Sequence, residues 1–76
     1  MKRYGYIEGI IFVKEFAKEK WALHPNADVT DFKAWRNIVN ELYDGLQTYG
    51  EENINALWQR FMIEWAQLRN TDKVKQ

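Results

Sequence analysis

Apolar side chains recur every three or four residues along most of this chain, and this spacing constrains the fold more than any other feature. The most regular stretch predicts a helix over about 30–49. On a helical wheel its apolar positions cover an arc of about 140°. These positions are Phe32, Trp35, Ile38, Val39, Leu42, Tyr43, Leu46 and Tyr49. A helix with this pattern buries one side only, so other elements must cover that side.

A second stripe comes earlier and predicts a helix over about 5–23. It consists of Tyr6, Ile10, Val13, Ala17 and Trp21. A glycine inside the stretch, at position 9, costs about 1 kcal/mol relative to alanine in a helix, so a strand over 4–13 remains the alternative. Because the residue before a proline disfavours helical geometry, the helix is expected to end near position 24, where Pro25 follows.

The third stripe predicts a helix over about 51–69, formed by Ile54, Leu57, Trp58, Phe61, Trp65 and Leu68. Gly50 is the expected left-handed residue that ends the preceding helix. Asp28 or Thr30 is expected to cap that preceding helix, with Asp31 near its positive end. Glu51 and Glu52 suit the N-terminus of the third helix for the same electrostatic reason.

Short connections favour antiparallel neighbours, so these helices predict an all-α fold, a small three-helix bundle that runs up, down and up. The single domain covers 1–69, and 70–76 is expected to be a frayed polar tail. Four tryptophans are expected to meet in the core: Trp21, Trp35, Trp58 and Trp65.

The composition excludes several classes of protein. The chain has 76 residues and no cysteine, so disulfides and thiolate zinc sites are excluded, and self-association is one remaining way to stabilise so small a domain. The basic N-terminus and the apolar stretch 7–13 do not make a signal peptide, because Glu8 interrupts that stretch. No segment approaches the roughly 20 apolar residues of a membrane span. We therefore expect a cytoplasmic protein.

Catalytic chemistry has little support in the sequence. There is no serine or cysteine and only one histidine, so an activated nucleophile with its base is missing. The glycines match no phosphate-binding motif. His24, Asp28 and Asp31 have side chains of metal-ligand type, but helix termini account for them better. We expect no enzyme activity, no metal and no cofactor.

The alternative function is a nucleic-acid-binding regulator, because many DNA-binding domains are three-helix bundles. It would use basic residues of the first two helices: Lys14, Lys18, Lys20, Lys33 and Arg36. Eleven basic residues are balanced by eleven acidic ones, and the net charge is zero. Such a chain has no strong field to attract a phosphate backbone, so nucleic acid is the less favoured partner.

Apolar residues exceed what one bundle interface can cover, and this surplus is the most informative functional signal. The surplus residues are Ile7, Ile11, Phe12, Met62 and Ile63. If they lie together they form a partner-binding patch for another protein or for a second copy in a homodimer. The alternative is that the first helix is central and is flanked by both others.

The leading hypothesis is a non-enzymatic helical module that binds protein, as an adaptor, an inhibitor or a self-assembling subunit. Small, neutral, aromatic-rich chains of this kind are compatible with proteins carried by phages or other mobile elements.

Overall fold

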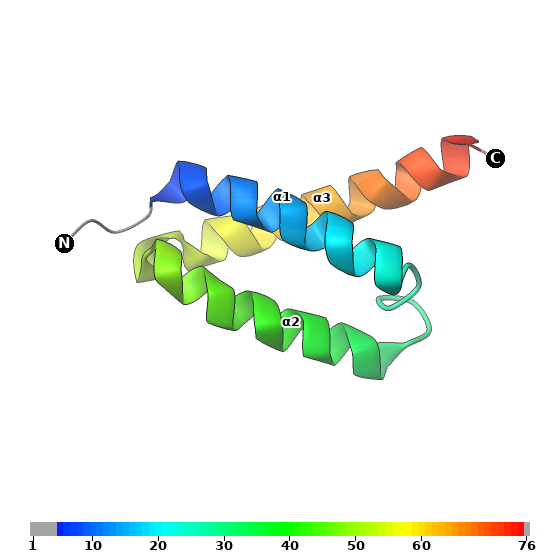
Figure 1. Cartoon of the computed structure of the whole chain (residues 1–76), viewed down its shortest axis with the longest axis horizontal. Helices are drawn as coiled ribbons and strands as arrows, with labels where there is room; N and C mark the ends of the chain where they lie inside the picture. The colour runs from blue at the N-terminus through cyan, green and yellow to red at the C-terminus, as the bar shows by residue number, and fades with distance from the viewer. Residues whose placement is uncertain (1–4, 76) are drawn as a thin grey trace.

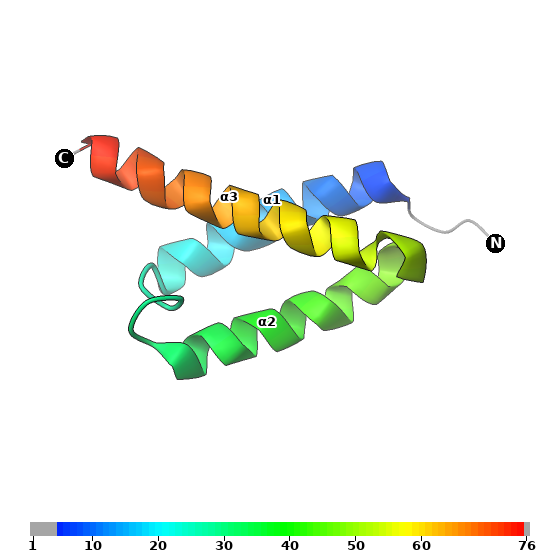
Figure 2. The ribbon, with the colours of Figure 1, turned by 180° about the vertical axis from the view of Figure 1, so that it is seen from behind.

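The chain folds into three helices, as the apolar spacing predicts. The computed structural model describes residues 5–75, with side chains over 5–71. Helix α1 spans Tyr6–Leu23, α2 spans Phe32–Leu46 and α3 spans Ile54–Lys75. Two 3-10 turns, Gln47–Tyr49 and Glu51–Asn53, connect α2 to α3. In Figures 1 and 2, α1 and α3 run in the same general direction. Helix α2, which comes between them in the sequence, runs in the opposite direction. The all-α three-helix architecture is therefore confirmed.

The N-terminal half of α1 is helical, so the strand alternative for 4–13 is wrong from Tyr6 onward, and position 4 lies outside the described residues. The backbone N–H of Gly5 donates to the Glu8 carboxylate at 3.0 Å, which satisfies one donor at the helix start. At the other end, the N–H of His24 bonds the Lys20 carbonyl at 2.8 Å just before Pro25. None of the helices in the described segment combines the length and apolarity that a membrane crossing needs.

The start of α2 differs from the expectation that Asp28 or Thr30 caps it. Asp31 is the N-cap, because its side chain accepts the N–H of Ala34 at 3.3 Å and the helix begins at the next residue. The hydroxyl of Thr30 instead bonds the carbonyl of Asn26 at 3.4 Å. Asp28 pairs with Arg69 of α3, which ties the α1–α2 loop to the third helix.

Replacing the cap residue provides a direct test of this assignment. Asp31→Ala is expected to lower the free energy of unfolding by about 1 kcal/mol, because an N-terminal N–H of α2 loses its acceptor. Asp31→Asn should keep most of that stability, since asparagine caps about as well. Urea denaturation followed by circular dichroism measures both changes. A larger loss in Thr30→Ala than in Asp31→Ala would contradict the assignment.

The end of α3 also differs from the prediction. The helix continues to Lys75, whereas the sequence predicted an end at 69 and a frayed tail over 70–76. The sequence after Gly50 contains no further glycine or proline, so no residue stops the helix once it has begun. Gly50 has a φ of 96°, the only positive φ in the described segment, but it does not end α2. The helix ends at Leu46 rather than near 49, because the chain tightens into a 3-10 turn over Gln47–Tyr49. Gly50 ends that turn, and its ψ of 130° lies outside the left-handed helical region.

Helices α1 and α3 approach closely because α1 presents small residues to α3. The buried residues of α1 are Gly9, Val13 and Ala17, which lie four apart on one face. A Cβ added at Gly9 would lie 2.5 Å from Cδ1 of Leu57, a fully buried residue of α3. The glycine that weakened the helix prediction is therefore a packing contact, where any side chain would collide with the neighbouring helix.

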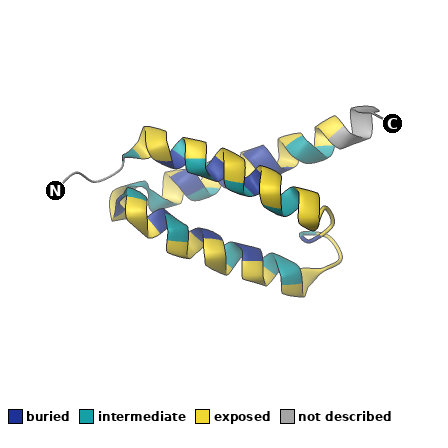
Figure 3. Ribbon diagram, viewed as in Figure 1, coloured by how far each residue is buried: buried dark blue, intermediate teal, exposed yellow. Residues whose placement is uncertain are grey.

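Buried positions occur on all three helices (Figure 3). Aromatic rings fill the centre of the bundle around Phe61 of α3. The centroid of its ring lies 5.8–6.0 Å from four other centroids, contributed by all three helices: Phe16, Trp35, Trp58 and Trp65. Of the four tryptophans expected in the core, only Trp65 is fully buried, and the other three are half-buried against the core. Phe61 joins the three helices into one cluster.

Candidate functional site

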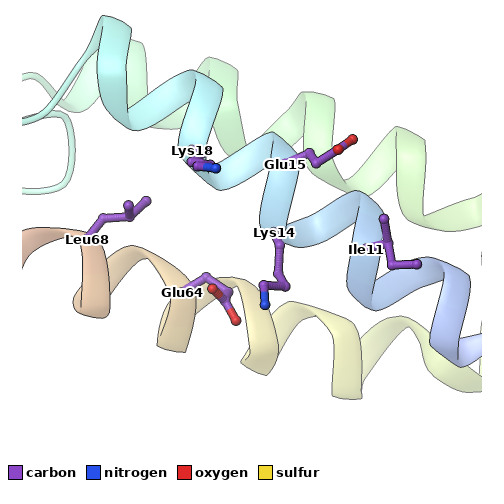
Figure 4. A pocket seen from close by; sticks show the side chains of 6 residues that line it. All are labelled: Ile11, Lys14, Glu15, Lys18, Glu64 and Leu68. Carbon is purple, nitrogen blue, oxygen red and sulfur yellow. The ribbon is translucent and has the colours of Figure 1, made fainter.

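A groove of about 390 Å³ lies between α1 and α3, with α2 behind α1 when the groove faces the viewer (Figure 4). We call it the α1–α3 groove. Its lining residues are Ile11, Lys14, Glu15, Lys18, Glu64 and Leu68. The groove combines exposed apolar surface with charge, which is the usual composition of a surface that receives an amphipathic partner.

The α1 wall of the groove follows from helical spacing. Ile7, Ile11, Lys14 and Lys18 are separated by three or four residues, so they share one face of α1. The two isoleucines are 72% and 56% exposed, respectively. In Figure 4, Lys14 points toward α3 whereas Glu15 points away from it. The groove side of α1 therefore carries apolar and positively charged groups.

The α3 wall contains a buried carboxylate that sequence reasoning missed. The side chain of Glu64 is 11% exposed, and its Oε2 lies 2.9 Å from Nε of Arg60, one turn earlier. Because an uncompensated buried charge is costly, this ion pair is what allows Glu64 to line the groove. The spacing of Arg60 and Glu64, four residues apart, predicts their ion pair from the sequence alone. The burial of Glu64 was not predictable, because it depends on where α1 crosses α3.

The structure separates the two surplus apolar residues of α3. Ile63 is 49% exposed and comes two residues after the fully buried Phe61, so it lies on the side of α3 away from the core, and it does not line the groove. Met62 follows Trp58 by four residues, and the ring of Trp58 lies 6.5 Å from that of Tyr43 in α2. Met62 therefore lies on the flank of α3 toward α2.

Phe12 does not belong to the exposed patch in which the sequence analysis placed it. It is half-buried, and its ring stacks on Tyr49 with centroids 5.4 Å apart. Its Cζ approaches the backbone of Gly45, where an added Cβ would lie only 2.5 Å away. The physical reason is helical rotation, since one step along α1 from Ile11 turns the side chain by about 100° toward α2.

Helix α1 is thus packed against both other helices, as the alternative interpretation of its apolar surplus expected. That packing accounts for Phe12, which contacts α2, and for Gly9, which contacts α3. It leaves Ile7 and Ile11 exposed. The surplus on α1 that remains after packing is smaller than the sequence indicated, and Ile11 is the part of it that lines the groove.

The basic residues of the nucleic-acid alternative are not gathered on one face. Nζ of Lys20 lies 2.9 Å from Oε2 of Glu41 in α2, so this lysine joins two helices of the bundle. Lys33 and Arg36 are exposed on α2, on the side opposite its buried stripe. Only Lys14 and Lys18 of this set line the α1–α3 groove.

The first loop offers little to a metal ion. Asp28 is paired with Arg69, and Asp31 caps α2. No group of three or more potential metal ligands occurs among the residues that the structure describes. The carboxylates near His24 therefore have structural partners.

A second hollow, of about 620 Å³, lies where α2 turns into α3. Its lining residues are Tyr43, Gln47, Glu51, Ile54, Asn55 and Trp58. About half of the exposed surface of this hollow is polar, whereas that of the α1–α3 groove is mostly apolar, so the hollow suits an apolar partner less well.

Protein-family models, curated protein sequences and solved structures give no match to this chain. A function for this chain therefore has to be inferred from the residues of the groove.

Proposed function

We propose that this chain is a non-enzymatic helical module that binds another protein by receiving one of its helices in the α1–α3 groove. The observation that carries the proposal is the exposure of Ile11, which lines the groove, with the more exposed Ile7 one turn earlier on the same face of α1. Exposed apolar residues are common singly, but a contiguous group beside a groove is typical of an interaction site. An adaptor or a small inhibitor would work in this way.

A helix docked in the groove would remove the exposed isoleucine side chains from water. Fully burying one isoleucine contributes roughly 1.5–3 kcal/mol. Ile7 and Ile11 are 72% and 56% exposed, and both lie on the regular helix α1. A helical partner would meet a preformed surface and lose little free energy to reordering of this protein.

The test compares the same substitution inside and outside the groove. Ile11→Glu is expected to abolish capture of a partner from a lysate of the source cells, because a carboxylate in the groove lining opposes apolar docking. Helical content and melting temperature should stay nearly unchanged, since Ile11 is 56% exposed. Ile63→Glu is the matched control, because Ile63 is 49% exposed and does not line the groove.

Two results would contradict the proposal. A large loss of stability in Ile11→Glu would show that this side chain is part of the core. Capture that is lost equally in Ile63→Glu would place the binding surface elsewhere. Sedimentation analysis of the chain alone covers the homodimer alternative, in which a dimer dissociated by Ile11→Glu would identify the partner as a second copy.

A further inference from the structure

Two lysines of the α1–α3 groove lack the ion pairs that other basic residues of the bundle make. Lys20 pairs with Glu41, Arg60 with Glu64 and Arg69 with Asp28. Lys14 and Lys18 are exposed and form no ion pair within the described segment. The groove therefore presents two positive charges beside its apolar surface.

The nearest carboxylate of α3 does not cancel these charges. Lys14 points toward α3, where Glu64 lines the groove (Figure 4). The charge of Glu64 is already balanced by Arg60 at 2.9 Å. Glu15 also borders the groove, but its side chain points away from α3. A partner in the groove therefore meets two lysines whose charges no ion pair among the described residues compensates.

We propose, on the basis of the proposed function, that the partner segment is an acidic amphipathic helix. Two of its carboxylates, one turn apart, face Lys14 and Lys18, and its apolar residues cover Ile11 and Leu68. The two lysines are four residues apart, a separation of about 6 Å along α1. Acidic residues at the same spacing on a helix match that separation, and opposite charges across an interface fix orientation and register.

A second copy of this chain fits the lysines less well. Glu8 of α1 accepts from the N–H of Gly5, and Glu41 of α2 lies 2.9 Å from Nζ of Lys20, so both are engaged. Glu19 is 72% exposed, but helical rotation places it farther from Ile11 than Glu15 is. In α1 of a second copy only Glu15 would be available beside the exposed isoleucines. A heterologous helix with two free carboxylates is the better match.

The experiment is a selection from displayed helical peptides of about eighteen residues. Each peptide has a fixed apolar stripe at helical spacing, and the flanking positions vary among Glu, Lys, Gln and Ala. The full chain is the bait. Clones that bind the wild-type chain are expected to carry glutamate at two flanking positions one turn apart. Their affinity should fall at least about tenfold for Lys14→Glu/Lys18→Glu and should weaken as salt is raised.

The matched control is Lys33→Glu/Arg36→Glu, which changes the net charge equally but on the outer side of α2. It should leave the affinity of the selected peptides nearly unchanged. A weakening equal to that of the groove variant would overturn the inference, because it would show a non-specific charge effect.

The remaining outcomes separate this inference from the proposed function. If the selected peptides show no charge preference but fail to bind Ile11→Glu, the inference of an acidic partner is wrong, and binding of a helix in the α1–α3 groove is supported. If the selected peptides still bind Ile11→Glu, the α1–α3 groove is not the binding site. If no peptide of any charge binds, both proposals fail.

Discussion

Phe61→Ala is expected to destabilise this protein by about 3–5 kcal/mol, the range measured when large buried aromatic side chains are truncated. Phe61 has no exposed surface, and its ring contacts rings from α1, α2 and α3. A domain of this length has a total stability of about 4–11 kcal/mol. The variant should therefore be largely unfolded at moderate urea concentrations at which the wild-type chain is folded, as measured by near-ultraviolet circular dichroism.

The control makes the same chemical change at an exposed position. Phe32 is 65% exposed at the start of α2, and Phe32→Ala should change the free energy of unfolding by about 0.5 kcal/mol or less. Equal losses in the two variants would mean that the aromatic cluster is not centred on Phe61.

Gly9→Ala is expected to destabilise the protein by about 1–3 kcal/mol, the usual cost of overpacking a core. At an exposed helical site the same substitution would stabilise by about 1 kcal/mol. Here the new methyl group would lie 2.5 Å from Cδ1 of Leu57, which is fully buried and has little room to move. Urea denaturation measures the loss.

A double-mutant cycle with Leu57→Ala separates the collision from other effects. Leu57→Ala alone should cost about 2–5 kcal/mol. In that background the methyl group of Gly9→Ala enters vacated space, so the second substitution should become stabilising. A destabilisation of the same size in both backgrounds would contradict the close approach of α1 and α3 at this point.

Helix positions were predictable from the sequence because they depend on local spacing. The apolar stripes placed α1, α2 and most of α3, but α2 ends at Leu46 and a 3-10 turn fills the last three residues before Gly50. The extension of α3 to Lys75 was missed because polar composition was interpreted as fraying, although no glycine or proline follows Gly50. The cap of α2 was displaced by one to three residues, since several polar residues of that loop are chemically able to cap it.

The candidate site was less predictable because it depends on which helices meet. Ile7, Ile11 and Ile63 are exposed in the structure, but Phe12 belongs to the α1–α2 contact and Met62 to the flank of α3 toward α2. The pairing of Asp28 with Arg69 joins residues 41 positions apart, and no local pattern indicates such a contact. The burial of Glu64 likewise follows from the crossing of α1 over α3.

The most direct test of partner binding through the α1–α3 groove is amide chemical-shift mapping of the isotope-labelled chain, titrated with an acidic helical peptide obtained by the selection described above. The account predicts that the largest shifts fall in two segments, 7–18 of α1 and 60–68 of α3. Residues around Tyr43 in the second hollow should change little. Largest shifts around Tyr43 and Gln47, with the α1–α3 groove unaffected, would contradict the account.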